Sequence, residues 1–265
     1  MQVLSINRKG RDVVRNIKLI IEYDGTNYCG WQRQNNVMTI QEKVERAIEE
    51  ITDEKALITG SSRTDAGVHA KGYTGNFYTD SKIAVEKFSG AINSKLPRDI
   101  VIIHACEVPY EFHSRYNSIG KMYSYTIINR RVAVAVGRNY IYHHQRILNV
   151  EDMKLGALYF MGTHDFSAFK NLGSSVKTSV RTITMLDVIK NEDVIKIYIA
   201  ADGFLYNMVR IIVGALIRVG EGKIKPNEIK DIIESKERSK AGKAVPSLWI
   251  MFGGSFLLNK RHKTL

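Results

Sequence analysis

The pattern of apolar and polar positions in the first half of the chain predicts alternating strands and helices. A β-branched, apolar run over residues 17–23 predicts a strand that ends at the turn Asp24-Gly25. Apolar residues at helical spacing follow Thr39, and Glu42 completes a Thr-x-x-Glu capping box, which predicts a helix over 39–52. The same reasoning predicts strands at 55–59 and 72–78, a helix at 82–95 stopped by Pro97, and a strand at 100–105.

The second half of the chain shows the same order of elements. We expect a strand at 121–128, a helix at 151–161, strands at 181–190 and 194–200, helices at 204–219 and 226–235, and a last strand at 248–257. Each half therefore reads β-α-β-β-α-β, the ferredoxin-like arrangement, and the fold class is α+β. The expected domains are a basic N-terminal arm at 1–16, an N-terminal domain at 17–113 and a C-terminal domain at 114–265. A large ligand is expected to lie in a cleft between the two halves.

Composition places the chain in the ordinary globular class and favours a polyanionic partner. Of 265 residues, 44% are hydrophobic and 25% charged, and the formal net charge is +12. The two cysteines, Cys29 and Cys106, lie far apart and lack a partnered histidine spacing, so neither a zinc site nor a disulfide framework is indicated and a cytoplasmic location is expected. Charged residues interrupt the apolar stretch at 204–219, and the first 16 residues do not resemble a signal peptide, so no membrane association is expected.

The loop Gly60-Ser-Ser-Arg-Thr-Asp-Ala-Gly-Val-His69 is the first candidate for chemistry. Its small residues surround Arg63 and Asp65 and permit close approach of a ligand to the backbone. One interpretation is an Asx-type turn, in which Asp65 bonds its own backbone ahead of Gly67. The other is a reactive carboxylate, with Arg63 engaging a phosphate or a base.

A carboxylate in a partly buried cleft needs a compensating cation or hydrogen bonds, and Arg210 is the candidate cation. Arg210 lies in a predicted helix that is apolar on nearly every side, where a guanidinium needs a buried partner. A structural ion pair elsewhere is the alternative. Tyr123 and Tyr125 alternate to one face of their predicted strand, where aromatic rings stack bases or simply fill a core.

Other motifs are weaker or missing. The segment 71–78 starts like the RNP1 signature of RNA-binding domains but departs from it at the central positions. There is no Walker A loop, dinucleotide fingerprint or HExxH motif, and the histidines lack metal-ligand spacing, so no cofactor or metal is expected. His113 stands apart because its setting is basic and aromatic.

Five motifs occur in a fixed order along the chain: Glu22–Gln34, Gly60–His69, Phe112–Arg115, Lys121–Tyr125 and Phe204–Gly214. Together they resemble the hallmarks of the tRNA pseudouridine synthase A family over roughly residues 17–220. The resemblance implies the pseudouridine synthase fold, with two ferredoxin-like halves, mixed mainly antiparallel sheets and a central basic active-site cleft. It also implies isomerisation of uridine to pseudouridine at positions 38, 39 and 40 of the tRNA anticodon stem-loop, by a cytoplasmic homodimer without a cofactor.

The resemblance assigns roles to individual residues. Asp65 matches the family's nucleophile, which attacks the base or the sugar or assists a glycal route. Arg210 is expected to pair with Asp65, and Tyr123 to stack on the target uracil and to transfer the proton at C5. Contacts to the RNA are expected from Arg63, Tyr123, Trp31, His69, His113 and Arg115.

Two departures from the family pattern bear on the choice of substrate. Asn207 stands where many relatives carry a histidine, and the segment 241–251 is only a loose version of the closing motif. A paralogue that acts on another RNA, such as ribosomal RNA, is therefore one alternative. A non-catalytic ferredoxin-like RNA-binding protein is the alternative from a different class, and the joint presence of Arg63, Asp65, Tyr123 and Arg210 argues against it.

Overall fold

The computed structural model describes residues 14–171, 173 and 176–257, and most of the predicted N-terminal arm lies outside these ranges. The first half contains β1 (Arg15–Tyr23), α1 (Ile40–Thr52), β2 (Thr59–Gly60), β3 (His69–Thr79), α2 (Val85–Asn93) and β4 (Ile100–Val108). The second half contains β5 (Ser118–Asn129), β6 (Tyr142–His144), α3 (Val150–Leu158), β7 (Gly162–Asp165), β8 (Val180–Asn191), β9 (Val194–Ala201), α4 (Met208–Gly220), α5 (Glu228–Ser235) and β10 (Ile250–Leu257).

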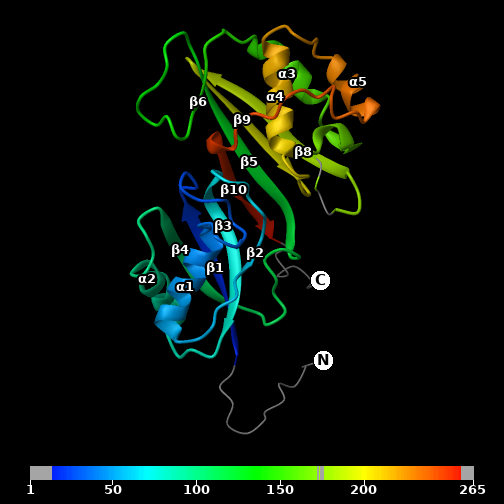
Figure 1. Ribbon diagram of the computed structural model, residues 1–265. Helices are drawn as coiled ribbons and strands as arrows, with labels where there is room; N and C mark the ends of the chain where they lie inside the picture. The colour runs from blue at the N-terminus through cyan, green and yellow to red at the C-terminus, as the bar shows by residue number, and fades with distance from the viewer. Residues whose placement is uncertain (1–13, 172, 174–175, 258–265) are drawn as a thin grey trace, which may run out of the picture.

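The strands form one mainly antiparallel sheet in which both halves use the same strand order (Figure 1). In the first half the order is β4-β1-β3-β2, and in the second it is β10-β5-β9-β8, extended by β7. When the short strands β6 and β7 are left out of the count, the order within each half is fourth, first, third, second. The predicted α+β fold with two β-α-β-β-α-β halves is therefore confirmed.

Several element boundaries differ from the prediction for local reasons. β1 begins at Arg15, so the last two residues of the predicted arm belong to the sheet. The strand predicted at 55–59 is reduced to Thr59–Gly60. The helix predicted from Phe204 begins at Met208, because Asn207 adopts a left-handed backbone conformation with φ 61°. The short strands β6 and β7 were not predicted, since three or four residues are too few to show a period.

Strand β10 joins the two halves. It pairs with β5 in antiparallel fashion along its length and with β3 in parallel fashion over Met251↔His69 and Phe252↔Ala70. β2 pairs farther along β3, at Thr59↔Asn76 and Gly60↔Gly75. Because β1 occupies the other edge of β3, β2 and β10 share one edge, and the loop at 61–68 emerges between them.

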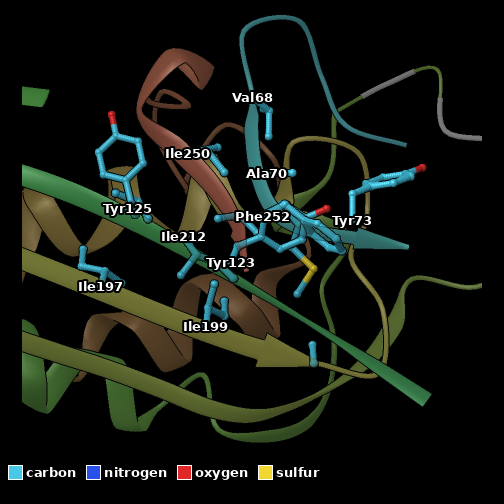
Figure 2. Close-up of a cluster of buried hydrophobic side chains, with 14 of the residues drawn as sticks. Val68, Ala70, Tyr73, Tyr123, Tyr125, Ile197, Ile199, Ile212, Ile250 and Phe252 are labelled. Atoms are coloured by element: carbon cyan, nitrogen blue, oxygen red, sulfur yellow. The ribbon is translucent and has the colours of Figure 1, made fainter. Parts of the chain in front are cut away.

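A cluster of buried aromatic rings fills the junction of the halves (Figure 2). Phe252 of β10 is fully buried, and its ring centroid lies 5.6 Å from that of Tyr73 in β3 and 5.0 Å from that of Tyr123 in β5. Aromatic pairs at such distances add stabilisation beyond the area that they bury. The cluster therefore fixes β3 and β5, which carry the two sides of the candidate site, relative to each other.

A buried polar network anchors the segment that links the halves. Asn76 of β3 is 1% exposed, and its Oδ1 accepts hydrogen bonds from Ser114 N (2.9 Å) and Ser114 Oγ (2.8 Å). Its Nδ2 donates to Asn16 Oδ1 at 3.0 Å, and Asn16 Nδ2 in turn donates to the carbonyl of Phe112 at 2.9 Å. Ser114 lies between His113 and Arg115, so this network positions two of the predicted RNA contacts.

We predict that Asn76→Ala lowers the free energy of unfolding by roughly 2–4 kcal/mol, because it leaves the buried Ser114 and Asn16 groups unsatisfied. Urea unfolding followed by circular dichroism measures the change. The control is Asn191→Ala, at an exposed position of β8, which should stay within about 0.5 kcal/mol of the unsubstituted protein. A loss below about 1 kcal/mol for Asn76→Ala would contradict the network's role.

Candidate active site

The loop at 61–68 is held from below by packed aromatic residues. Trp31 stacks on Tyr73 with ring centroids 3.8 Å apart, and the Tyr73 hydroxyl donates a hydrogen bond to the Ser62 carbonyl. A side chain at Gly60 would collide with the Tyr73 hydroxyl and the Trp31 ring, so only glycine fits there. Thr64 is fixed from the other side, because its Oγ1 bonds the Tyr23 hydroxyl at 2.9 Å. The loop therefore has a rigid base on which its exposed residues are displayed.

The turn within the loop is closed by the main chain and leaves the Asp65 carboxylate available. Val68 N donates to the Asp65 carbonyl at 3.2 Å, and Gly67 takes a positive φ of 79°. Ser247 Oγ adds a bond to the Ala66 carbonyl at 2.6 Å. The Asx-type turn considered from the sequence would use the Asp65 side chain, whereas that side chain instead contacts Arg210.

Arg210 approaches Asp65 from the first turn of α4. Its Nη1 lies 3.5 Å from Asp65 Oδ2, and the two side chains are 23% and 31% exposed. The guanidinium is also held by protein groups that do not belong to the loop, since Nε donates to the Val245 carbonyl at 2.7 Å and Nη1 donates to Asn207 Oδ1 at 2.9 Å. The Arg210 guanidinium, on an otherwise apolar helix, therefore has three partners: the Val245 carbonyl, Asn207 Oδ1 and the Asp65 carboxylate.

Burial dominates the electrostatics of Asp65. Desolvation raises the pKa of its carboxyl above the usual value, although the charge and the hydrogen bond of Arg210 act in the opposite direction. A carboxylate that has lost part of its water shell is a better base and nucleophile than a fully hydrated one. The arrangement suits a carboxylate that reacts at neutral pH.

Tyr123 forms the aromatic wall beside Asp65. Its ring packs edge-to-face against Phe204 (5.1 Å) and Phe252 (5.0 Å), and its hydroxyl lies 3.2 Å from Ser62 Oγ. Burial and, to a smaller extent, the nearby Asp65 charge raise the pKa of Tyr123 to about 12, while the hydrogen bond with Ser62 acts in the opposite direction. The phenol is therefore protonated at neutral pH, and it acts as a base only after passing its own proton on.

These groups line a cleft with a volume of about 470 Å³, within the usual range for binding sites of small groups. Of the residues predicted from the sequence, the structure brings these into the cleft: Trp31, Arg63, Asp65, His113, Arg115, Tyr123 and Arg210. Arg63 and Arg115 are exposed. The His113 ring lies 4.2 Å from that of Tyr116, so a cationic and aromatic rim faces the carboxylate.

Two of the residues predicted to contact RNA, Trp31 and His69, are almost completely buried. Trp31 is only 2% exposed and forms the floor of the cleft under the loop. His69 is 1% exposed and lies outside the cleft, with its ring nitrogens 2.9 Å from Asp24 Oδ1 and 2.6 Å from the Leu248 carbonyl. It lines a second cavity, together with Met122 and Ser124. Because Lys121 and Tyr123 line the first cleft, strand alternation places this cavity on the opposite face of the sheet.

Some cleft residues had been given no site role from the sequence, and Asn207 had been noted only as a departure from the family pattern. Ser62, Lys121, Phe204 and Asn207 all line the cleft. Lys121 and Phe204 are the first residues of the motifs Lys121–Tyr125 and Phe204–Gly214. Their place in these motifs was the sequence feature that could have identified them as cleft residues. The role of Asn207 in holding Arg210 depends on its left-handed backbone and could not be read from residue type alone.

Within the described ranges, no group of three or more His, Cys, Asp or Glu side chains is arranged to hold a metal ion. In the same part of the chain, no helix has the length and apolar character needed to cross a membrane.

Comparison with known proteins gives strong similarities. A family model described as tRNA pseudouridine synthase matches residues 19–117 and 157–249. A protein of Clostridium perfringens named tRNA pseudouridine synthase A 2 is 57% identical over 233 residues, which cover 88% of this chain and 96% of that protein. Proteins named tRNA pseudouridine synthase A from Clostridium botulinum and Acetivibrio thermocellus are 58% and 53% identical, with the same two coverages.

The electrostatic argument for Asp65 predicts the direction of a pKa change. Arg210→Met removes both effects that lower the pKa of the Asp65 carboxyl, so that pKa should rise further above its usual value. Carbon NMR titration of the Asp65 carboxyl measures it. Arg63→Met is the control, since Arg63 has no such effect on Asp65 and should leave the midpoint unchanged. An unchanged or lower midpoint in Arg210→Met would refute the pairing.

Proposed function

The chain belongs to the tRNA pseudouridine synthase family, and from this premise we propose that Asp65 is its catalytic nucleophile and that uridines 38, 39 and 40 of the tRNA anticodon stem-loop are its targets. The enzyme is an isomerase that converts uridine to pseudouridine in tRNA. The observation that carries the proposal is the position of Asp65, a partly desolvated carboxylate with Arg210 3.5 Å away, in a cleft walled by Tyr123.

The reaction rearranges one nucleotide without an external reagent. The bond between N1 of uracil and C1′ of the ribose breaks, the uracil turns within the cleft, and a bond forms between C5 and C1′. The net proton change is loss from C5 and gain at N1. Asp65 serves this sequence by attack on the sugar or the base, or by removing a sugar proton on a glycal route. All three routes require an ionised carboxylate beside the target nucleotide.

The residues around Asp65 supply the other functions that the reaction needs. Arg210 keeps Asp65 ionised and oriented, because its own position is set by Val245 and Asn207 and does not depend on the substrate. The ring of Tyr123 stacks on the target uracil and its hydroxyl takes part in proton transfer at C5. Arg63, His113 and Arg115 contact the RNA at the rim. Trp31 supports the loop from below, and His69 acts at a distance by fixing its C-terminal end.

The geometry of the cleft favours a flipped-out nucleotide. The carboxylate lies inside a cavity, so the target base must leave its stack to reach it, and a loop or the end of a stem costs less to open than a continuous duplex. Positions 38 to 40, at the boundary of the anticodon loop and stem, fit this requirement.

The remaining parts of the proposal concern assembly and organisation. The units 17–113 and 114–265 form the two walls of the cleft, and the enzyme works as a homodimer in the cytoplasm. A formal charge of +12 on each chain suits two protomers that together bind one large polyanion.

We predict that Asp65→Asn lowers the rate of pseudouridine formation about 10⁴-fold or more while the dissociation constant for tRNA changes less than about threefold. Asparagine keeps the shape of the side chain but cannot act as a nucleophile or base. The exposed Asp187→Asn is the matched control and should retain full activity. In cells lacking the gene, the unsubstituted gene or the Asp187→Asn variant should restore the pseudouridines at positions 38, 39 and 40. The Asp65→Asn variant should not restore them, and pseudouridine mapping of the tRNA measures this.

Residual activity of purified Asp65→Asn near the normal rate would refute the nucleophile. Restoration of pseudouridines only in ribosomal RNA would refute the assigned tRNA positions and leave the nucleophile standing.

A second prediction separates the ring of Tyr123 from its hydroxyl. Tyr123→Phe keeps the stacking surface and should leave tRNA affinity unchanged. The single-turnover rate constant for pseudouridine formation should fall about 100-fold, because the proton-transfer group is gone. Single-turnover kinetics with a filter-binding assay gives both values. The control, Tyr78→Phe, changes an exposed tyrosine of β3 whose hydroxyl bonds the Tyr110 carbonyl outside the cleft. Full turnover by Tyr123→Phe would limit Tyr123 to stacking.

A further inference from the structure

Lys121 of β5 is a half-buried cation with an unusual environment. Its side chain lines the cleft that contains Asp65, yet among the residues that the structure describes it has no hydrogen-bond or ion-pair partner. The charges that act on it are two further cations, Arg115 and Arg181. Placing like charges together and partly out of water is costly unless an anion occupies the site.

The strand register shows how these residues come together. Lys121 pairs with Ala201 of β9, which also pairs with Ile183 of β8, so the three residues form a row across the sheet. Arg181 precedes Ile183 by two residues and therefore lies on the same face. Tyr123 follows Lys121 by two residues on that face as well, about 7 Å along the strand. Lys121 and Arg115 thus line the cleft beside Tyr123, and Arg181 lies outside the lining but close enough for its charge to act on Lys121.

Neighbouring groups leave room for a ligand and offer it one more polar contact. The Nε of Arg181 lies 3.5 Å from where a Cβ at Gly203 would be, so the Arg181 side chain lies over this glycine. Its Nη1 donates to the carbonyls of Thr178 (3.0 Å) and Val180 (2.5 Å), which leaves Nε and Nη2 for a ligand. Ser255 of β10 pairs directly with Lys121, and its Oγ is buried without a hydrogen-bond partner in the described part of the chain. Donors on β5 and β10 are therefore direct neighbours, and Arg181 of β8 adds its charge on the same face of the sheet.

The electrostatic state of Lys121 agrees with this geometry. Burial, together with the charges of Arg115 and Arg181, lowers the pKa of its ammonium group to about 8. A bound anion would raise this pKa again, because its negative charge favours the ammonium form.

We propose that Arg115, Lys121 and Arg181 form an anion site that binds a backbone phosphate of the RNA, adjacent to the target uridine. Guanidinium groups match two phosphate oxygens at once, and an ammonium group supplies a compact third charge. Contacts to phosphate fix register without reading sequence, so this site would set which nucleotide is presented to Asp65. The inference rests on the proposed function only for the identity of the neighbouring nucleotide.

A binding cycle with chemically neutralised phosphates tests the proposal. The RNA is a tRNA anticodon stem-loop in which the phosphate on either side of the target uridine is replaced, one at a time, by an uncharged methylphosphonate. Every protein carries Asp65→Asn, so the RNA stays unconverted during the measurement. Lys121→Met should weaken binding of the unmodified RNA about tenfold. One of the two methylphosphonate replacements should weaken binding by the reference protein, which carries Asp65→Asn alone, to the same extent. On that modified RNA, Lys121→Met should cause little further loss.

Three other variants sharpen the cycle. With Arg181→Met, the loss of affinity from the substitution and the loss from replacing the same phosphate should likewise fail to add. This variant tests the site independently if Lys121→Met does not fold. Lys121→Arg should preserve most of the affinity and the coupling. Lys190→Met, at the exposed far end of β8, is the control and should give losses that add to those of both replacements.

The outcomes are distinct. Thermal stability of Lys121→Met should be unchanged or higher, because a buried charge has been removed. Additive losses at both flanking phosphates for Lys121→Met and Arg181→Met would overturn the proposal, and a lowered melting temperature with such additivity would make Lys121 a structural residue. A failure of Asp65 as nucleophile is distinguishable, because it would appear as pseudouridine in RNA recovered from the Asp65→Asn complexes, whereas a failure of the anion site would appear as additive losses of affinity.

Discussion

The parallel pairing of β10 with the first two residues of β3 is the constraint on which the rest of the site depends. It brings the second half of the sheet against the first at an edge that β2 would cover if it were longer. Because β2 ends after Gly60, the loop that follows has to leave the sheet at this junction. Asp65 is thereby carried to a point that faces both β5 and the first turn of α4. The aromatic cluster around Phe252 holds this junction closed, so the carboxylate, Tyr123 and Arg210 approach one another from three elements that are distant in sequence.

The Asp65–Arg210 pair shows how such a site keeps a reactive carboxylate. A short two-oxygen contact with arginine would stabilise the anion strongly and reduce its basicity. Here the separation is 3.5 Å, and the best hydrogen bonds of the guanidinium go to the Val245 carbonyl and to Asn207. The cation is therefore close enough to favour ionisation but is largely satisfied by other oxygens. Burial raises the pKa of Asp65 more than Arg210 lowers it, and the carboxylate remains available to the substrate.

The parts of this structure that follow from local patterns could be predicted, and those that depend on long-range register could not. Thr39 caps α1 by accepting from Glu42 N, as the capping box indicates, and the periodic apolar positions give the helices to within a few residues. Residue chemistry made Arg63, Asp65, Arg210 and Tyr123 candidates, and the resemblance of short motifs assigned their roles and added the other predicted contacts. The truncation of β2, the pairing of β10 with β3 across about 180 residues and the burial of His69 on the far side of the sheet each depend on which strands meet. A residue's own sequence neighbourhood does not contain that information.

The positions of the charges also explain why Arg210 is fixed by the protein and not by its ligand. A phosphate bound near Lys121 would bring negative charge into the same cleft as Asp65, and that charge would raise the pKa of the carboxyl further. The base would also exclude water from Asp65 as it entered, with an effect of the same sign. Both changes would oppose ionisation at the moment when the proposed nucleophile is needed. A guanidinium held in advance by Val245 and Asn207 needs no rearrangement to oppose them, because its charge already lies beside the carboxylate when the nucleotide arrives.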